Sequence, residues 1–193
     1  MTNEIEKFKN YLSQIVSIDK ESFDIAIKYF EVETFAKNEC FVKEGHLCSK
    51  IAYINEGLFR IYYLKDGTEI NTCFCMENSM TSSFNSFLNQ VPSKATIQAL
   101  EDSIVVALSY KNLAKLYNEN AIWQTISRSL TEKECLRLSD RASSLSFESA
   151  LEKYKNLLQY KPEIIQRVSV QHIASYIGVS RETLSRIRSQ IRE

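Results

Sequence analysis

The sequence predicts an α+β protein in which N-terminal helices lead into an antiparallel β-roll, a long central helix and a C-terminal helix-turn-helix. Three observations support this fold class. The apolar spacing changes from helical to strand-like near residue 35 and becomes helical again after residue 110. An Asp-Gly pair at 66–67 gives a strong hairpin signal inside the strand-like region. Near the C-terminus, a small residue, a glycine and a serine follow one another at the spacing of a sharp helix-to-helix turn.

Composition excludes several classes of protein. The chain has 193 residues with 44% hydrophobic and 25% charged residues, which is ordinary for a globular fold and unlike a disordered or collagen-like chain. Five cysteines form an odd set, and we expect reduced thiols rather than a disulfide scaffold. The first ten residues are polar and no apolar run approaches the roughly 20 residues of a membrane span, so a cytoplasmic protein is expected.

The N-terminal third of the sensor region is predicted to be helical. Ile5, Phe8 and Leu12 recur at helical spacing, and a second run contains Phe23 and Phe30. We therefore expect helices over residues 1–33, ahead of the first strand.

From residue 35 to 110, short runs rich in β-branched and aromatic residues alternate with turns. This spacing favours an antiparallel barrel or a double-sheet roll. The expected strands cover 50–54, 58–64, 69–76 and 95–107. The polar stretch 77–92 interrupts them, with Phe84, Phe87 and Leu88 as its expected apolar anchors. Cys73 and Cys75 alternate along one strand and should share a face.

After residue 110 the helical spacing returns. Ser109 can cap a short helix, and Asn120 can cap a long one over about 121–145. A heptad-like stripe runs along the long helix, and it either packs on its own domain or forms a dimer seam. The stripe consists of Thr131, Cys135, Leu138, Ala142 and Leu145. A further helix is expected over about 147–159.

The neutral net charge conceals an asymmetry. Residues 151–193 contain eight basic and four acidic residues, while residues 1–150 contain 16 basic and 20 acidic ones. A basic end on an acidic body indicates an interaction surface at the C-terminus.

Residues 170–190 have the pattern of a helix-turn-helix. Ile173, Ala174 and Ile177 form the inward face of a first helix, and Gly178 can adopt the positive φ of the turn. Ser180 is a good N-cap for a second helix. On that second helix, Leu184, Ile187 and Ile191 are buried by their spacing, which leaves a basic face exposed.

The exposed face has the chemistry of a base-reading helix. An arginine near the helix N-terminus can bond guanine, a glutamate can accept from cytosine, and hydroxyls can hold phosphates. The alternative is an ordinary helical hairpin with solvated arginines. The expected DNA-contacting residues are Ser169, Gln171, Ser180, Arg181, Glu182, Thr183, Ser185, Arg186 and Arg188.

The run from Ile173 to Ile187 resembles the helix-turn-helix of the Crp/Fnr family of bacterial transcription regulators. In that family, the positions of Arg181, Glu182 and Arg186 read operator bases, and all three residues match the cyclic-AMP receptor protein branch. The resemblance covers nearly the whole chain. It implies a β-roll sensor domain with N-terminal helices at 1–118, a central dimerisation helix at 119–146 and a DNA-binding domain at 147–193.

The sequence departs from the nucleotide-binding branch of this family at the phosphate cassette. Ser82-Ser83 stands where that branch has Gly-Glu, and Ser93-Lys94 precedes the alanine where it has an arginine and a hydroxyl residue. Without the guanidinium, a buried phosphate loses its strongest partner, so cyclic AMP is not expected as the effector. The resemblance places a candidate effector pocket at Ser82, Ser83, Phe84, Ser93, Lys94, Leu138 and Ser139.

The iron–sulfur branch of the family, a metal site and a complete C-terminal wing are also not expected. Residues 1–39 contain no cysteine, whereas an iron–sulfur cluster needs several closely spaced thiolates. No spacing of His and Cys predicts another metal site, and no cofactor is expected. Because the sequence ends at Glu193, directly after the second helix, the β-hairpin wing of most family members is expected to be truncated or absent.

Three functions follow from these observations. The first is a homodimeric DNA-binding regulator whose implied partners are double-stranded DNA, a second copy of the chain, RNA polymerase and an unidentified small-molecule effector. A variant of it uses Cys135 as a redox-sensitive thiol on the seam. The second is a small-molecule-binding roll that acts as a protein-interaction module. An enzyme is the third, and it is disfavoured because no catalytic motif is present.

Overall fold

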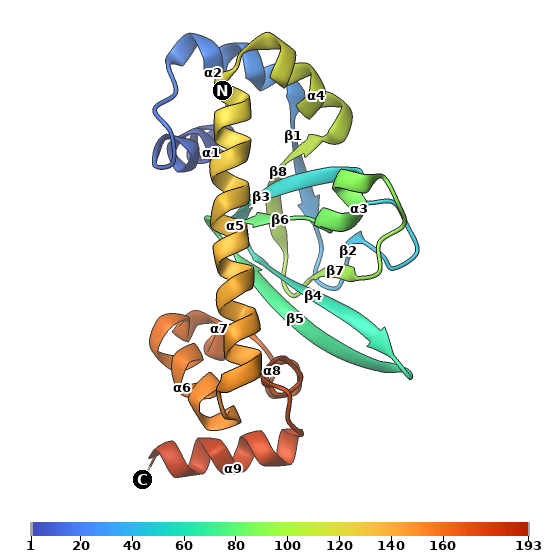
Figure 1. Cartoon of the computed structure of the whole chain (residues 1–193), viewed down its shortest axis with the longest axis vertical. Coiled ribbons are helices and arrows are strands. Elements are labelled where there is room, and N and C mark those ends of the chain that lie inside the picture. The colour runs from blue at the N-terminus through green and yellow to red at the C-terminus, as the bar shows by residue number, and fades with distance from the viewer. Residues whose placement is uncertain (1, 193) are drawn as a thin grey trace.

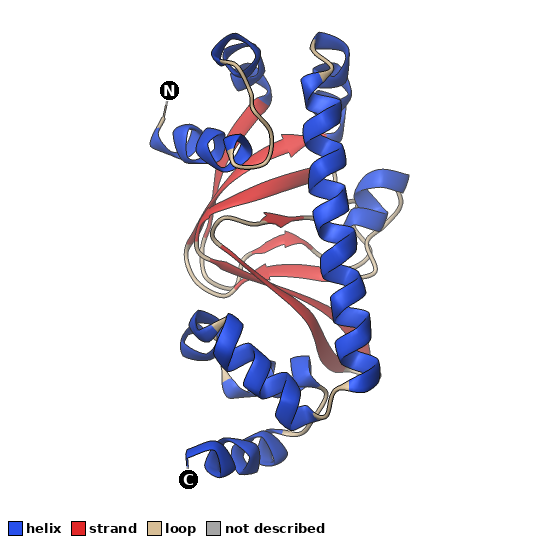
Figure 2. Ribbon diagram, turned by 60° about the vertical axis from the view of Figure 1, so that its left-hand side comes forward, coloured by secondary structure: helices blue, strands red, loops and turns tan. Residues whose placement is uncertain are grey.

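The computed structural model describes residues 2–192 and places the predicted parts in one elongated molecule (Figure 1). The 26-residue helix α5 (Ile122–Phe147) runs along most of its length. Figure 2 shows the N-terminal helices at one end, two β-sheets in the middle and the C-terminal helices at the other end. The α+β architecture predicted from the sequence is confirmed.

The N-terminal helices end earlier than expected. They are α1 (Asn3–Ser13), α2 (Lys20–Ala26) and the short 3-10 helix η1 (Ile27–Tyr29). The expectation of helix up to residue 33 was wrong, because strand β1 already begins at Phe30. Residues 30–35 pair in register with residues 103–108 of the last strand, and this long-range pairing overrides the helical spacing.

Two four-stranded antiparallel sheets form the roll. The first has the order β1-β8-β3-β6 and the second has the order β2-β7-β4-β5. The strands are β1 (Phe30–Phe35), β2 (Cys40–Val42), β3 (Lys50–Glu56), β4 (Leu58–Lys65), β5 (Thr68–Met76), β6 (Met80–Thr81), β7 (Thr96–Ala99) and β8 (Ser103–Ser109).

Two details of the roll differ from the sequence prediction. The single strand expected over 95–107 is two strands, and they belong to different sheets. Within residues 77–92, helix α3 (Phe84–Asn89) buries Phe87, but Leu88 is 58% exposed and is not an anchor.

The turn between β3 and β4 requires a glycine. Gly57 has a φ of +104°, and a Cβ atom at this position would lie 2.8 Å from the Cα atom of Ser103. The β3–β4 turn therefore approaches the start of β8 too closely for any residue with a side chain.

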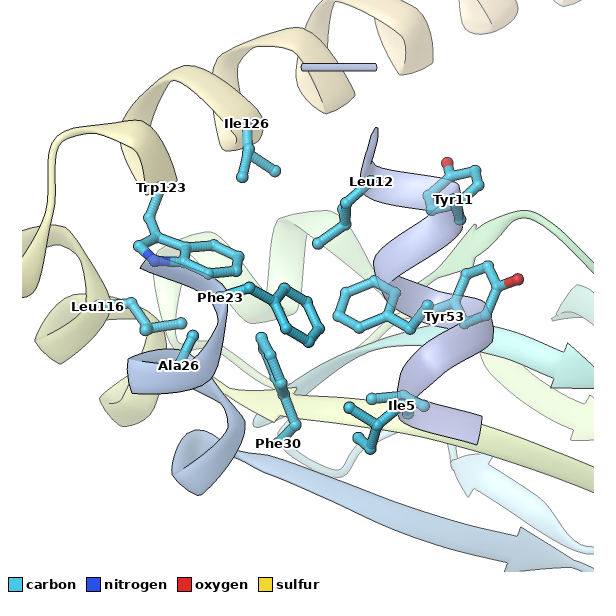
Figure 3. Packing of buried hydrophobic residues seen from close by; sticks show 12 residues of the cluster. Ile5, Tyr11, Leu12, Phe23, Ala26, Phe30, Tyr53, Leu116, Trp123 and Ile126 are labelled. Carbon is cyan, nitrogen blue, oxygen red and sulfur yellow. The ribbon is translucent and has the colours of Figure 1, made fainter. Parts of the chain in front are cut away.

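An aromatic core joins the roll to the start of α5 (Figure 3). Phe8 and Phe30 meet edge to face with ring centroids 5.2 Å apart, and Trp123 of α5 packs against Phe30 at 5.7 Å. Leu116 of α4 (Tyr110–Glu119) is fully buried beside them. The roll and the long helix are thus held together by one apolar cluster.

The C-terminal helices are α6 (Ala150–Tyr160), α7 (Pro162–Arg167), α8 (Val170–Ile177) and α9 (Arg181–Arg192). Ser149 and Glu152 form a capping box that separates α6 from α5. Among residues 2–192, no helix has the length and apolar character needed to cross a membrane.

Candidate nucleic-acid interface

The predicted helix-turn-helix is formed by α8 and α9. Gly178 ends α8 with a φ of +83°, and its N–H group donates to the carbonyl of Ala174 at 3.0 Å. The N–H group of Val179 donates to the same carbonyl, which is the closure of a Schellman cap. The Ser180 hydroxyl then accepts from the backbone N–H of Thr183 at 3.2 Å and starts α9.

The two helices pack through the apolar positions that the sequence identified. Side chains of Ile173, Ala174 and Ile177 are 2% exposed, Leu184 is fully buried and Ile187 is 8% exposed. This packing fixes which side of α9 faces away from the protein.

The opposite face of α9 is exposed and lies at the end of the molecule (Figures 1 and 2). Of the nine predicted DNA-contacting residues, Thr183 and Arg188 are half-buried. The other seven are exposed: Ser169, Gln171, Ser180, Arg181, Glu182, Ser185 and Arg186. A shallow hollow joins the start of α8 to this face and is lined by Val170, Arg181, Ser185, Arg188 and Ser189.

Glu182 keeps its charge on this basic face. The backbone N–H at the start of α9 and the Ser180 hydroxyl lower the pKa of its carboxyl group. An ionised carboxylate only accepts hydrogen bonds, so it can meet a base amino group but is repelled by phosphate.

The helix-turn-helix is fastened to the roll by an ion-pair cluster that the sequence did not reveal. Arg167 of α7 donates Nη1 to Oε2 of Glu77 at 2.9 Å and Nη2 to Oε1 at 2.8 Å. The same guanidinium also pairs with Glu101. The Arg167 guanidinium holds the pKa of Glu77 at about 2, because the charged carboxylate accepts two bonds from it.

Helix α8 also contacts strand β5 directly. The Ser175 hydroxyl donates to the carbonyl of Glu69 at 2.9 Å and accepts from the N–H of Asn71 at 3.0 Å. The ring of Phe74 lies 5.2 Å from the ring of Tyr176. The helix-turn-helix is therefore packed on the hairpin of β4 and β5 through both polar and apolar contacts.

In the candidate effector pocket, the two cassette positions come together. The Ser93 hydroxyl donates to the Ser83 hydroxyl at 2.8 Å, and Ser93 is 3% exposed. Ser82 is buried as well and donates to the carbonyl of Lys50, while Lys94 is exposed. The serines thus bond to each other and to the backbone. Phe84, which follows Ser83 in the chain, is half-buried.

The remaining two pocket residues, Leu138 and Ser139, lie on the exposed side of α5. The described contacts do not link them to the serines within this chain. No group of three or more His, Cys, Asp or Glu side chains in the described part of the chain is placed to hold a metal ion.

Comparison with known proteins identifies the roll. Residues 32–120 match the cyclic nucleotide-binding domain family. This segment is a cyclic nucleotide-binding domain. No curated protein matches the sequence.

The whole chain shares its fold with solved Crp/Fnr-type structures. A protein from Eubacterium rectale assigned to the Crp/Fnr family of transcriptional regulators superposes with a TM-score of 0.72 at 16% identity, covering 95% of this chain and 88% of the other. The c-di-GMP-responsive global regulator CLP of Xanthomonas campestris gives 0.70 at 18%, covering 90% and 92%. The catabolite activator protein of Thermus thermophilus gives 0.59 at 19%, covering 94% and 86%.

Helix α5 follows the cyclic nucleotide-binding domain, and the residues of its predicted dimer seam are exposed to solvent. All five stripe residues are exposed, with Leu138 at 51% and Leu145 at 53%. The alternative that the stripe packs on its own domain was wrong. Leu136 and Phe147, which the stripe does not include, are 68% and 88% exposed and lie on another side of the helix.

Proposed function

We propose that the chain is a homodimeric, sequence-specific DNA-binding transcription regulator of the Crp/Fnr type and not an enzyme. The observation that carries this proposal is the exposed face of α9, where Arg181, Glu182 and Arg186 face solvent at the end of the molecule. An exposed recognition helix on a rigid scaffold is what major-groove docking requires.

Each residue on this face has a distinct role in the proposal. Arg181 and Arg186 donate to guanine O6 and N7, and Glu182 accepts from the amino group of cytosine. The remaining residues hold phosphates and set the orientation of the helix. They are Ser169, Gln171, Ser180, Thr183, Ser185 and Arg188.

The exposed seam of α5 supports the homodimer. Two copies joined along Thr131, Cys135, Leu138, Ala142 and Leu145 would bury an apolar stripe that one chain leaves in water. A two-fold dimer presents two recognition helices to half-sites about 34–36 Å apart, so a palindromic operator is expected.

The effector of the proposed regulator is not cyclic AMP. The cassette lacks a carboxylate and a guanidinium, and the Ser83 and Ser93 hydroxyls are already bonded to each other. A buried cyclic phosphate would have to break that bond and would meet no bidentate donor. We propose that a different small molecule is the effector. The regulator would act in the cytoplasm and would contact RNA polymerase.

A DNA selection with the purified protein tests this function. We expect a palindromic consensus to be enriched, both with and without cyclic AMP. On the selected operator, Arg181→Ala and Glu182→Ala should each lose about tenfold or more of the preference over scrambled DNA. Lys155→Ala is the matched control, because it removes one exposed positive charge from α6 and should keep the preference.

Two results would contradict the proposal. Equal affinity of the unmutated protein for operator and scrambled DNA would favour a protein-interaction module. A consensus that appears only with cyclic AMP would overturn the interpretation of the cassette serines.

A further inference from the structure

Strand β5 carries two buried thiols in contact with each other. Cys73 and Cys75 lie on the same face, are 8% and 7% exposed, and their Sγ atoms are 3.6 Å apart. Both are free thiols. At this distance either thiol can donate a hydrogen bond to the other.

An arginine from the long helix contacts this pair. Nη1 of Arg137 lies 3.4 Å from Sγ of Cys73. The guanidinium is fixed by two bonds to Glu134, from Nε at 2.7 Å and from Nη2 at 2.6 Å. A fixed positive charge beside one sulfur favours its thiolate form.

The second sulfur has a different environment. A hydrogen bond from Cys75 and the charge of Arg137 lower the pKa of Cys73 to about 7, whereas the same hydrogen bond and burial raise the pKa of Cys75. Thr81 of β6 is 1% exposed, and its hydroxyl lies beside Cys75. The site therefore holds two thiols of unequal acidity, of which Cys73 is the more acidic, and a buried hydroxyl beside them.

We propose that Cys73 and Cys75 form a modification site for hydroperoxides, in which Cys73 is the nucleophile and Cys75 is the resolving thiol. The site would supply the proposed regulator with an oxidant signal. The effect of oxidation on DNA binding rests on the proposed function. The thiol chemistry does not, because it is inferred from the geometry of the two cysteines and Arg137.

The chemistry proceeds in two balanced steps. The Cys73 thiolate attacks one oxygen of the peroxide, the O–O bond breaks, and the other oxygen leaves as hydroxide, so the protonated product is a sulfenic acid. The Cys75 sulfur then attacks the Cys73 sulfur as its thiol proton leaves, and the S–O bond breaks to release water. Together the two sulfurs lose two electrons, which the peroxide gains.

The strand spacing allows the bond but strains it. Residues two apart on a strand have Cα atoms about 6.6 Å apart, near the upper end of the range that a disulfide spans. A strained disulfide is readily reduced, which suits a reversible signal better than a structural bridge.

The site is connected to the DNA-binding end. Phe74 lies between the two cysteines, and its ring contacts Tyr176 of α8 at 5.2 Å. Arg141 of α5 also contacts Tyr176, because its guanidinium lies over the tyrosine ring at 3.8 Å from the ring centroid. A disulfide would remove the negative charge beside Arg137 of α5 and would bend β5 at Phe74. Oxidation would therefore act on the two elements, α5 and β5, that contact Tyr176 of α8.

Peptide mapping tests the modification directly. Trypsin releases residues 66–94 as one peptide, which contains Cys73 and Cys75 and no other cysteine. The full chain is treated with hydrogen peroxide, its free thiols are alkylated, and the protein is digested. We expect this peptide to be unalkylated and lighter by two hydrogen atoms, while the peptide containing Cys40 is alkylated.

Variants separate the two roles. In Cys75→Ser, the sulfenic acid at Cys73 should persist and be trapped by dimedone. Arg137→Met should slow the oxidation of Cys73 about tenfold or more, and Cys135→Ser should leave it unchanged. Circular dichroism of each variant shows that the fold is kept.

The proposal is overturned if the peptide 66–94 carries two alkylated cysteines after treatment that fully oxidises the exposed Cys135. An equal oxidation rate in Arg137→Met and the unmutated protein would also overturn it. Failure of the chain to discriminate DNA sequences would refute the proposed function but would leave these thiol measurements unchanged, so the two failures are distinguishable.

Discussion

Replacing Glu77 by glutamine tests the ion pair that fastens the helix-turn-helix to the roll. The substitution keeps the shape of the side chain and removes the charge that Arg167 contacts at 2.8 and 2.9 Å. The N–H of Gly57, which donates to Oε1 of Glu77 at 2.9 Å, keeps an oxygen acceptor. The loss of folding free energy in Glu77→Gln therefore reports mainly on the ion pair between Glu77 and Arg167.

The size of the loss follows from the pKa of Glu77. It is about 2 in the folded chain against an ordinary value of 4.5, and the full difference corresponds to an upper limit of about 3 kcal/mol. Because 34% of the Glu77 side chain is exposed, solvent screening reduces the expected loss to about 1–2 kcal/mol at pH 7.

The pH dependence has a definite sign. A carboxyl group with a lowered folded pKa stabilises the protein above about pH 4.5, and this stabilisation is lost as the pH falls towards 2. Glu77→Gln should therefore be less stable than the unmutated chain at pH 7 and nearly equal to it at pH 2.

Urea unfolding followed by circular dichroism measures this difference. Glu56→Gln is the matched control, because Glu56 is 54% exposed and pairs only with Lys7 among the described residues, so it should cost at most about 0.5 kcal/mol. A double-mutant cycle with Arg167→Met should show a coupling of about 1 kcal/mol. Equal losses in the Glu77 and Glu56 variants, or additive energies in the cycle, would refute the reasoning.

Three further substitutions test the fold and the seam. Gly57→Ala should lose about 2 kcal/mol or more in urea unfolding, because the new Cβ meets the backbone of Ser103 at 2.8 Å and the φ is positive; unchanged stability would contradict the turn geometry. Leu116→Ala should lose about 2–5 kcal/mol in the same assay, since its side chain is fully buried, and a loss below that range would place Leu116 outside the core. Leu138→Glu should convert the dimer to a monomer in light scattering, whereas Leu64→Glu, at an equally exposed site on β4, should not; a persistent Leu138→Glu dimer would contradict the seam.

The helix-turn-helix could be predicted because its signals are local. Gly178 closes α8 onto a carbonyl four residues earlier, and Ser180 caps α9 through an N–H three residues later. Such bonds depend on residue types within one or two turns, so the sequence carries them directly.

The ends of the β-strands and the docking of the C-terminal helices on the roll depend on residues that are distant in the sequence. The strand expected over 95–107 divides because its first part, β7, pairs with β2 and β4 in one sheet, whereas β8 pairs with β1 and β3 in the other. Arg167 and Glu77 are 90 residues apart. In the sequence, the three consecutive apolar residues 73–75 indicate that both faces of β5 are buried, because neighbouring residues of a strand face opposite sides.

The central claim is that α9 reads bases, and the ratio of two dissociation constants tests it most directly. Fluorescence anisotropy gives the affinity of the unmutated protein for its selected operator and for scrambled DNA of equal length, at one physiological salt concentration. We predict a preference of about 10³-fold or more for the operator. A ratio near one at that salt concentration would contradict the claim.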